Sequence, residues 1–173
     1  MNQADNTKRI ANTACAGTTI RPLRAMDIAP LVALMRRNRR HLNAHSSWDE
    51  VIDGAEADLQ GRVEGDGAPL AFAIWCGDHL AGGLTLLPVN PPRFGLSYWV
   101  DAGHTRRGAG TAAVAEAVEH ARPMATDLYA GVTHGNIASV RVLRRAGFVV
   151  VEEFEEYTRY HLRLTDAAPS TIT

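Results

Sequence analysis

The chain has 173 residues, of which 46% are hydrophobic and 21% charged, with 18 Lys and Arg against 19 Asp and Glu. This length predicts one sizeable core rather than two independent domains, and the balanced charge excludes a global attraction to nucleic acid or an anionic membrane. Polar residues without periodicity predict tails over 1–17 and 166–173. We therefore expect a single folded unit over 18–165.

Two features bear on the compartment of the protein. No apolar run is long enough to span a bilayer, and the N-terminus lacks the apolar core of a signal peptide. Cys15 and Cys76 lie far apart and do not have the pattern of a disulfide framework. Together these features predict a cytoplasmic protein.

The first part of the folded unit predicts a strand over 18–23 and two helices. Asp27 can cap the first helix, and Ser47 with Glu50 has the spacing of a capping box for the second. The apolar residues expected on the inner faces of these helices are Ile28, Leu31, Val32, Met35, Val51, Ala55 and Leu59.

An antiparallel meander is expected next, because apolar runs over 69–76 and 79–87 flank Gly77 and a third run covers 94–100. The elements expected after it begin with a helix over 111–121, whose small residues Ala113, Ala117 and Ala121 on one face allow close approach to the sheet. A strand over 128–132, a helix with Ala138, Val142 and Ala146 on one face, and strands over 148–151 and 157–164 follow. The order β-α-α-β-β-β-α-β-α-β-β predicts an α/β fold with a mixed sheet and helices on both faces.

The turn over 103–111, with the sequence GHTRRGAGT, joins the meander to a helix and is typical of an anion-binding segment. Glycines let the main chain approach a ligand, and the first N–H groups of a helix lack internal partners. No Gly-Lys-Ser/Thr follows, which excludes a P-loop. Gly108, Gly110 and Ala113 fit the dinucleotide pattern, but the turn follows a meander rather than opening a βαβ unit. A dinucleotide site and a plain solvent-exposed connection remain alternatives.

Three stretches together resemble the GNAT acetyltransferases, and within them the ribosomal-protein-alanine N-acetyltransferase (RimJ/RimL) group: NRRHLNAHSSW, LSYWVDAGHTRRGAGTAAV and GNIASVRVLRRAGF. The resemblance implies acetyl-CoA as cosubstrate, no metal, and two central strands that splay around the pantetheine arm. Thr105 departs from the family motif, which has Gln or Arg there. The residues that the resemblance, with the turn, assigns to acetyl-CoA are Trp99, Val100, Arg106, Arg107, Gly108, Ala109, Gly110, Thr111, Asn136 and Ser139.

The resemblance also implies direct acetyl transfer to a primary amine in a ternary complex. Ser139 resembles the family serine that protonates the coenzyme A sulfur, and Glu156 resembles the family glutamate that acts as a base. Tyr98 is a further catalytic or channel candidate, and His45 and Trp48 are candidates for the acceptor pocket. Simpler alternatives are a helix cap for Asn136, a first-turn residue for Ser139, a solvated acid for Glu156 and a core residue for Tyr98.

A protein N-terminal α-amino group is the expected acceptor, because its pKa of about 8 makes it neutral more readily than a lysine at about 10.4. A small-molecule amine is the alternative, and a non-catalytic acyl-CoA-binding module is the alternative of another class. The arginines over 36–40 could contact an acidic acceptor, but helix-end arginines commonly just complement the helix dipole, and nucleic acid is not expected as a partner. Dimers are frequent in this family, so the resemblance makes a homodimer one possible assembly.

Overall fold

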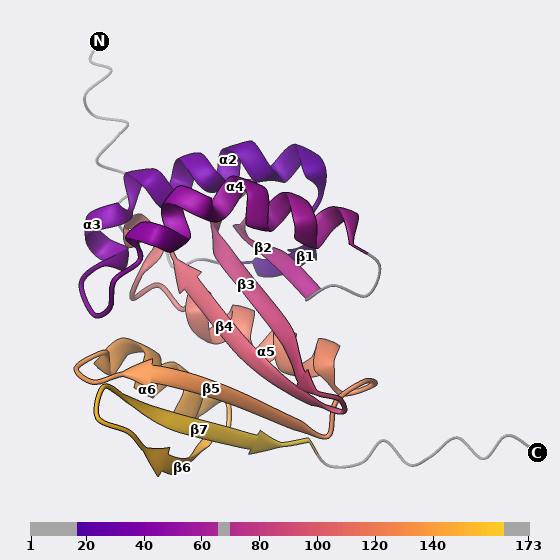
Figure 1. The fold of residues 1–173 in the computed structure, drawn as a ribbon, viewed down its shortest axis with the longest axis vertical. Helices are drawn as coiled ribbons and strands as arrows, with labels where there is room; N and C mark the ends of the chain where they lie inside the picture. Colours follow the sequence, from indigo (N-terminus) through magenta and orange to yellow (C-terminus); the bar gives the residue numbers. More distant parts are fainter. Residues whose placement is uncertain (1–16, 66–69, 165–173) are drawn as a thin grey trace, which may run out of the picture.

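The computed structural model describes residues 17–65 and 70–164. They form a seven-stranded mixed sheet in the order β1-β2-β3-β4-β5-β7-β6, with helices on both faces (Figure 1). Only β4 and β5 pair in parallel among these neighbours. The elements are β1 Thr18–Pro22, α2 Ala25–Arg37, α3 Arg39–Leu42, α4 Asp49–Glu64, β2 Leu70–Cys76, β3 His79–Asn90, β4 Arg93–Val100, the 3₁₀ helix η2 Ala102–His104, α5 Ala109–Ala121, β5 Asp127–Thr133, α6 Ile137–Arg145, β6 Val149–Glu153 and β7 Tyr157–Arg163.

The expected fold class and order of elements are confirmed, with α3 and η2 as additions. Neither addition was expected, because a single turn of helix is too short to show apolar periodicity. The expected tails lie outside the described residues, apart from Gly17.

The starts of the two N-terminal helices differ from expectation. Helix α2 begins at Ala25, so Asp27 is its third residue, and Asp27 accepts a hydrogen bond at 3.1 Å from the main-chain N–H of Arg24. Helix α4 begins at Asp49, and no side chain caps it, so the capping box predicted at Ser47 is wrong.

The inner face of α4 differs from the predicted one at its first residue, while Leu59 packs against the core as expected. Ile52 is fully buried, whereas the side chain of Val51 is 53% exposed. Ala55 is buried as expected. The predicted apolar face of α2 is confirmed, since Ile28, Leu31, Val32 and Met35 are all buried.

The sheet separates two hydrophobic cores. Helices α2 and α4 cover one face around Leu31 and Ile52, and α5 and α6 cover the other around Val114 and Leu143. The expected small-residue face of α5 is confirmed, because Ala113, Ala117 and Ala121 are fully buried and let the helix approach the sheet closely. In α6 the inward residue is Leu143, and Ala138 of the predicted face is exposed.

The centre of the sheet is split. β4 and β5 pair only from Arg93 to Gly95 and from Asp127 to Tyr129, while β5 goes on pairing with β7 as far as Thr133. Figure 1 shows the two strands together at their starts and diverging toward their ends. The predicted splay is therefore present, and it leaves one side of β4 without a strand partner from Leu96 to Val100.

Cys76, the last residue of β2, is disulfide-bonded, which the sequence did not lead us to expect. Cys15 lies outside the described residues. No helix within residues 17–65 and 70–164 is long and apolar enough to cross a membrane. The cytoplasmic location stays a prediction.

Candidate active site

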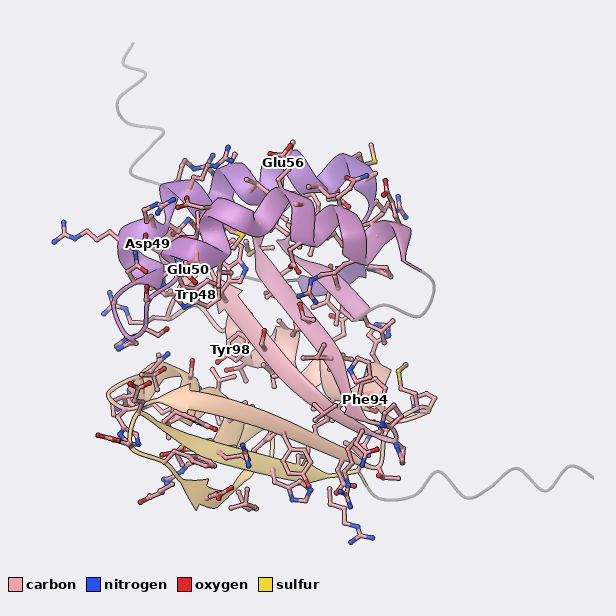
Figure 2. The ribbon with its side chains drawn as sticks, viewed as in Figure 1. Trp48, Asp49, Glu50, Glu56, Phe94 and Tyr98 are labelled. Carbon is pink, nitrogen blue, oxygen red and sulfur yellow. The ribbon has the colours of Figure 1, made fainter. Side chains whose placement is uncertain are left out.

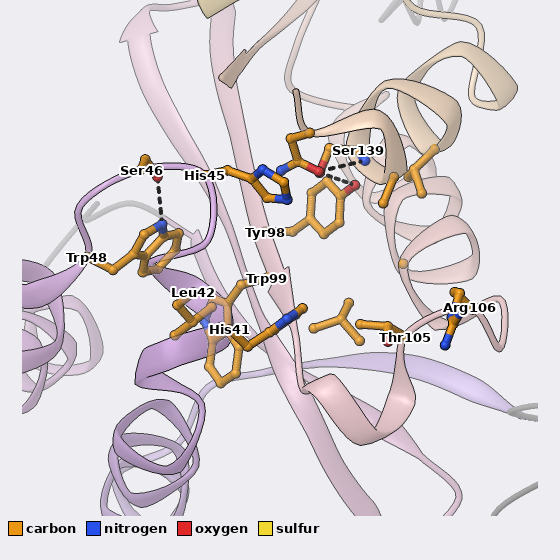
Figure 3. A pocket seen from close by; sticks show the side chains of 15 residues that line it. His41, Leu42, His45, Ser46, Trp48, Tyr98, Trp99, Thr105, Arg106 and Ser139 are labelled. Carbon is orange, nitrogen blue, oxygen red and sulfur yellow. Dashed lines mark hydrogen bonds between the residues drawn. The ribbon is translucent and has the colours of Figure 1, made fainter. Parts of the chain in front are cut away.

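A cavity of about 190 Å³ opens at the splay, and we call it the splay cavity (Figure 3). The loop between α3 and α4 forms one of its walls, β4 its floor, and the starts of α5 and α6 the opposite wall. Its lining residues are His41, Leu42, His45, Ser46, Trp48, Tyr98, Trp99, Val100, Thr105, Arg106, Gly110, Asn136, Ala138, Ser139 and Val142. Segments far apart in the sequence thus meet at one place.

Most of the residues predicted for the site line this cavity, including His45, Trp48, Tyr98, Asn136 and Ser139. Arg107, Gly108, Ala109 and Thr111 are not part of the lining, although they belong to the turn and first turn of α5 that adjoin it.

Glu156 lies apart from the splay cavity. It is exposed in the turn between β6 and β7, and its main-chain oxygen accepts a hydrogen bond at 3.1 Å from the N–H of His134. Its carboxylate is therefore not assembled with Tyr98 and Ser139. The structure offers no geometric support for Glu156 as the base.

The strand β4 presents alternate main-chain groups to the splay. The N–H of Asp101 donates to Ala81 of β3 at 2.7 Å, and the carbonyl of Trp99 lies against Gly82 of the same strand. Because successive residues of a strand direct their main-chain groups to opposite sides, those of Val100 face the gap. Val100 thus fits the predicted main-chain contact with a ligand, whereas Trp99 contributes its side chain.

The turn before α5 has an unusual main-chain path. Arg106 and Gly108 both have positive φ, at 59° and 85°. No atom lies within 4 Å of the position where a Cβ would stand on Gly108, so the main chain there is accessible. No side chain caps α5, and its first N–H groups remain available to an anion. These features fit a pyrophosphate.

Tyr98 and Ser139 join the two sides of the cavity. Figure 2 shows Phe94 where β4 pairs with β5, and Tyr98 farther along, where the strands have separated. The Tyr98 hydroxyl donates to Ser139 Oγ at 3.2 Å (Figure 3). Burial raises the pKa of Tyr98 above its ordinary value, although the bond to Ser139 acts in the opposite direction. Tyr98 therefore keeps its proton across neutral pH.

Asn136 is the cap of α6. Its Oδ1 accepts a hydrogen bond from the N–H of Ser139 at 3.1 Å. Asn136 also lines the splay cavity. The capping alternative is thus present in the structure, while the contact with coenzyme A that the resemblance implies is not tested by it.

The sequence reasoning missed the polar network that holds the turn before α5. Asn38 is 5% exposed and donates to Asp101 Oδ1 at 2.7 Å, while the N–H of Ala102 donates to Asn38 Oδ1 at 2.9 Å. His104 Nδ1 lies 2.8 Å from Asp101 Oδ2, which also accepts from the N–H of Gly103. The network ties the end of α2 to the turn.

The charge of Asp101 depends on that network. Burial opposes its ionisation, but the hydrogen bonds from Asn38, His104 and the Gly103 N–H outweigh the burial and lower the pKa of the carboxyl. The only sequence signal was an Asn directly after an apolar helix, and such a residue is usually a solvated helix end.

The loop that carries His45 and Trp48 is anchored by side chains of α3 and α4. Asn43 Oδ1 accepts from the N–H of Trp48 at 2.6 Å, and the indole of Trp48 donates to Ser46 at 3.0 Å. Arg39 forms ion pairs with Asp49 and Asp53. Among the arginines over 36–40, Arg39 therefore has a structural role, because both of its acidic partners belong to α4.

The site combines an uncapped helix N-terminus, a gap beside a strand, and a pair of hydroxyl groups. It can hold an anionic ligand with an extended arm and deliver a proton at the far end of that arm. Within the described residues, no group of three His, Cys, Asp or Glu side chains could hold a metal ion.

Comparisons with known proteins agree with this geometry. The family model for the acetyltransferase (GNAT) domain matches residues 18–149. Among solved structures, RimL, a ribosomal L7/L12 alpha-N-protein acetyltransferase in complex with coenzyme A, has a TM-score of 0.75 at 19% identity, over 89% of this chain and 96% of that chain. No curated protein matches the sequence.

Other similar structures differ in their substrates. Ribosomal-protein-S5-alanine acetyltransferase from Vibrio fischeri has a TM-score of 0.76 at 17% identity, over 89% of this chain and 97% of that chain. Spermidine N-acetyltransferase from Vibrio cholerae, in complex with CoA and spermine, has a TM-score of 0.70 at 18% identity, over 85% and 95%. These likenesses establish the fold. Because the family model spans most of the described residues, the dinucleotide alternative falls and the chain belongs to the GNAT family of acetyltransferases.

Proposed function

We propose that this protein transfers an acetyl group from acetyl-CoA to a primary amine by direct attack in a ternary complex. The acceptor that we propose is the α-amino group of a protein N-terminus. The observation that carries the proposal is the splay cavity, where the uncapped start of α5 and the Tyr98–Ser139 pair flank the free side of β4. RimL and the spermidine enzyme, solved with coenzyme A and CoA respectively, support the choice of cosubstrate.

In this proposal the turn before α5 binds the pyrophosphate. Arg106 supplies charge at the cavity, and the first N–H groups of α5, at Ala109, Gly110 and Thr111, supply hydrogen bonds. Arg107 adds charge beside them. The pantetheine arm then runs along β4, where main-chain groups of Val100 face the gap. The absence of Gln or Arg at position 105 leaves more of the binding to main-chain N–H groups.

The reaction itself needs a neutral amine and a proton for the leaving group. The amine nitrogen attacks the thioester carbonyl, the carbon–sulfur bond breaks, an amide forms, and the coenzyme A thiolate takes up a proton. Ser139 can donate that proton through its own hydroxyl while it accepts one from Tyr98 at 3.2 Å. The raised pKa of Tyr98 keeps the second donor protonated.

The attacking amine needs no side-chain base of its own in this scheme. An α-amino group with a pKa of about 8 is neutral to a useful extent near neutral pH. The acceptor's surplus proton leaves to water. Glu156, exposed and outside the cavity, is not assigned a step.

The small-molecule alternative stays open because the similar structures include enzymes for both substrate classes. RimL and the S5 enzyme act on proteins, and the Vibrio cholerae enzyme is a spermidine N-acetyltransferase. One of the similar structures is dodecameric, so oligomers occur among them, and a homodimer is one possible assembly for this chain.

A screen for thiol release from acetyl-CoA tests the function. The panel contains N-terminal peptides, polyamines and amino sugars, and we expect turnover with the peptides. Turnover with small amines alone would overturn the protein-substrate proposal. Coenzyme A binding by calorimetry without turnover on any amine would favour a non-catalytic acyl-CoA-binding module.

Two variants test the proton donor. Ser139→Ala should lower kcat by about 10²-fold, the lower range for general acid–base catalysis, with KM for acetyl-CoA nearly unchanged. Tyr98→Phe removes the second hydroxyl and should lower kcat less. An unchanged kcat in Ser139→Ala would remove Ser139 from the mechanism.

A further inference from the structure

A second opening at the splay lies on the sheet face that α4 covers, and we call it the open-face cavity. It has a volume of about 310 Å³ and is lined by β4 around Ser97 and by β5 around Tyr129. These are the positions where the pairing of β4 with β5 stops, at Gly95 and Tyr129. The open-face cavity and the splay cavity therefore flank the same gap.

Arg62 of α4 is the cation on the helix side of the open-face cavity. Its Nε donates to Asp58 at 2.7 Å, which fixes the direction of the guanidinium. Its Nη1 is buried and has no hydrogen-bond partner among the described residues. A buried donor without an acceptor is unfavourable by about 1–3 kcal/mol, more for a charged group. Such a donor is expected to take an oxygen that a ligand brings.

The surroundings of Arg62 leave room for that oxygen. A third cavity, of about 240 Å³, lies between α2, α4 and the sheet, and shares Arg62, Thr85 and Ser97 with the open-face cavity. Arg62 thus stands at the junction of the two spaces. The small hydroxyl residues beside it offer further hydrogen bonds and little steric obstruction.

The charged residues that line the open-face cavity disfavour a cationic ligand. No Asp or Glu is among its lining residues in the described part of the chain, and the two charged lining groups are Arg62 and Arg159. Arg159 already bonds Glu152 at 2.8 Å and the Tyr157 hydroxyl at 3.2 Å. Arg62 is therefore the lining cation with an unused donor.

We propose that Arg62 is a specificity-determining residue that donates through Nη1 to a carbonyl or carboxylate oxygen adjacent to the acceptor amine. The acceptor class is an α-amino carbonyl compound, such as a peptide N-terminus or a free α-amino acid amide. A polyamine lacks that oxygen, and no carboxylate is among the described residues that line the open-face cavity. This inference rests on the proposed acetyl transfer, because it assigns the acceptor of that reaction.

The chemistry of Arg62 suits this role. A guanidinium has five N–H donors in a planar fork, so one can stay on Asp58 while another meets the substrate. A site built to hydrogen-bond a substrate group discriminates strongly against an analogue that lacks it, because its own polar group is then left unpaired. Substitution of Arg62 should therefore change KM for the acceptor and leave KM for acetyl-CoA unchanged.

The test compares Arg62→Met with wild type on three acceptors: an alanyl tripeptide amide, alaninamide and propylamine. We expect KM for both carbonyl-bearing acceptors to rise by about tenfold or more, with kcat and KM for acetyl-CoA within about twofold. The tripeptide and alaninamide separate a peptide from a free amino acid amide as the source of the oxygen. KM for propylamine should stay the same, because propylamine has no oxygen that could accept a hydrogen bond from Arg62.

Two controls separate recognition from folding. Arg122→Met removes an ion pair to Glu119 on α5, outside the lining of all three cavities, and should leave KM for every acceptor unchanged. Arg62→Lys keeps the charge with fewer directed donors and should recover part of the peptide KM. An equal rise of KM for propylamine, or a peptide KM within twofold of wild type in Arg62→Met, would overturn the role of Arg62.

A binding arm makes the inference independent of turnover. Calorimetry measures the tripeptide amide against the protein saturated with coenzyme A. Loss of at least tenfold in affinity in Arg62→Met supports the inference even if wild type acetylates no amine, in which case only the proposed function fails. If wild type acetylates peptides and Arg62→Met binds the tripeptide amide as wild type does, the proposed function stands and the role of Arg62 fails.

Discussion

The two helices that begin at the splay, α5 and α6, start in opposite ways. Helix α6 has Asn136 as its cap, whose side chain accepts the N–H of Ser139. Helix α5 follows Gly108, which has no side chain to offer, and no other side chain caps it. Both starts line or adjoin the same cavity. The first N–H groups of α6 thus have a side-chain acceptor, whereas those of α5 have none among the described residues.

Because of this difference, the start of α6 should matter for stability and the neighbouring start of α5 for ligand binding. A capped start contributes to folding, while an uncapped start with positive φ before it keeps its N–H groups for an anion. We therefore expect changes near α5 to alter coenzyme A affinity with little effect on stability. Changes near α6 should do the reverse.

The largest effect should come from Gly110→Val. A Cβ at Gly110 would already lie 3.3 Å from the ring of Tyr98 and 3.6 Å from Val142. A valine fills the cavity and covers the first turn of α5, so the Kd for coenzyme A should rise by about 100-fold, equivalent to losing two charge-assisted hydrogen bonds. Calorimetry measures it. Gly54→Val, on an open part of α4, is the control, and equal weakening in both variants would contradict the assignment.

Arg106→Gly should weaken coenzyme A binding by about tenfold, through the loss of one charged contact. The melting temperature should hardly change, because Gly relieves the left-handed backbone at φ 59° but also loosens the unfolded chain. Asparagine also tolerates this left-handed conformation but carries no charge, so Arg106→Asn should weaken coenzyme A binding to the same extent. Wild-type affinity should fall with salt more steeply than that of either variant. A large loss of stability with intact binding would place Arg106 in the fold alone.

Asn136→Ala should act on the other helix. Removing the cap should lower the free energy of unfolding by about 1 kcal/mol, measured by urea denaturation. Coenzyme A affinity should change by less than about threefold. Asn136→Ser restores a capping oxygen and should recover most of the stability. A tenfold loss of affinity in Asn136→Ala would instead show that Asn136 also contacts the ligand.

The sequence was informative where periodicity and turn chemistry act locally. The alternation of apolar residues predicted the meander, and the small residues of α5 predicted its close packing on the sheet. The glycine turn at 103–111 predicted an anion site from residue types alone; α5 begins there without a side-chain cap, and the bound anion stays a prediction. The start of α4 was misplaced because Ser47 matched a capping pattern, while Asn43, five positions before Trp48, makes the hydrogen bond.

Contacts between distant segments were beyond the reach of the sequence. The bond from Asn38 to Asp101 joins residues 63 positions apart, and nothing local marks either as its partner. Arg62 looked like an ordinary surface arginine on a helix. Its position beside the splay depends on how α4 packs on the sheet. The resemblance placed Glu156 in the site by motif, and the structure puts its carboxylate elsewhere.

The smallest expected effect is on the pH dependence of stability, through Asp101, whose hydrogen bonds hold the turn before α5. The lowered pKa of Asp101 means that its charge stabilises the fold above about pH 4, and that this stability is lost as the pH falls through the folded-state value. Asp101→Asn should make the decline of melting temperature below pH 4 shallower, with a drop of only a few degrees at pH 7. Asp78→Asn, in the exposed turn between β2 and β3, should leave the profile unchanged. If Asp101→Asn keeps the wild-type acid profile, other carboxyl groups hold the fold together at low pH, and the anchor of α5 lies in the neutral hydrogen bonds of Asn38.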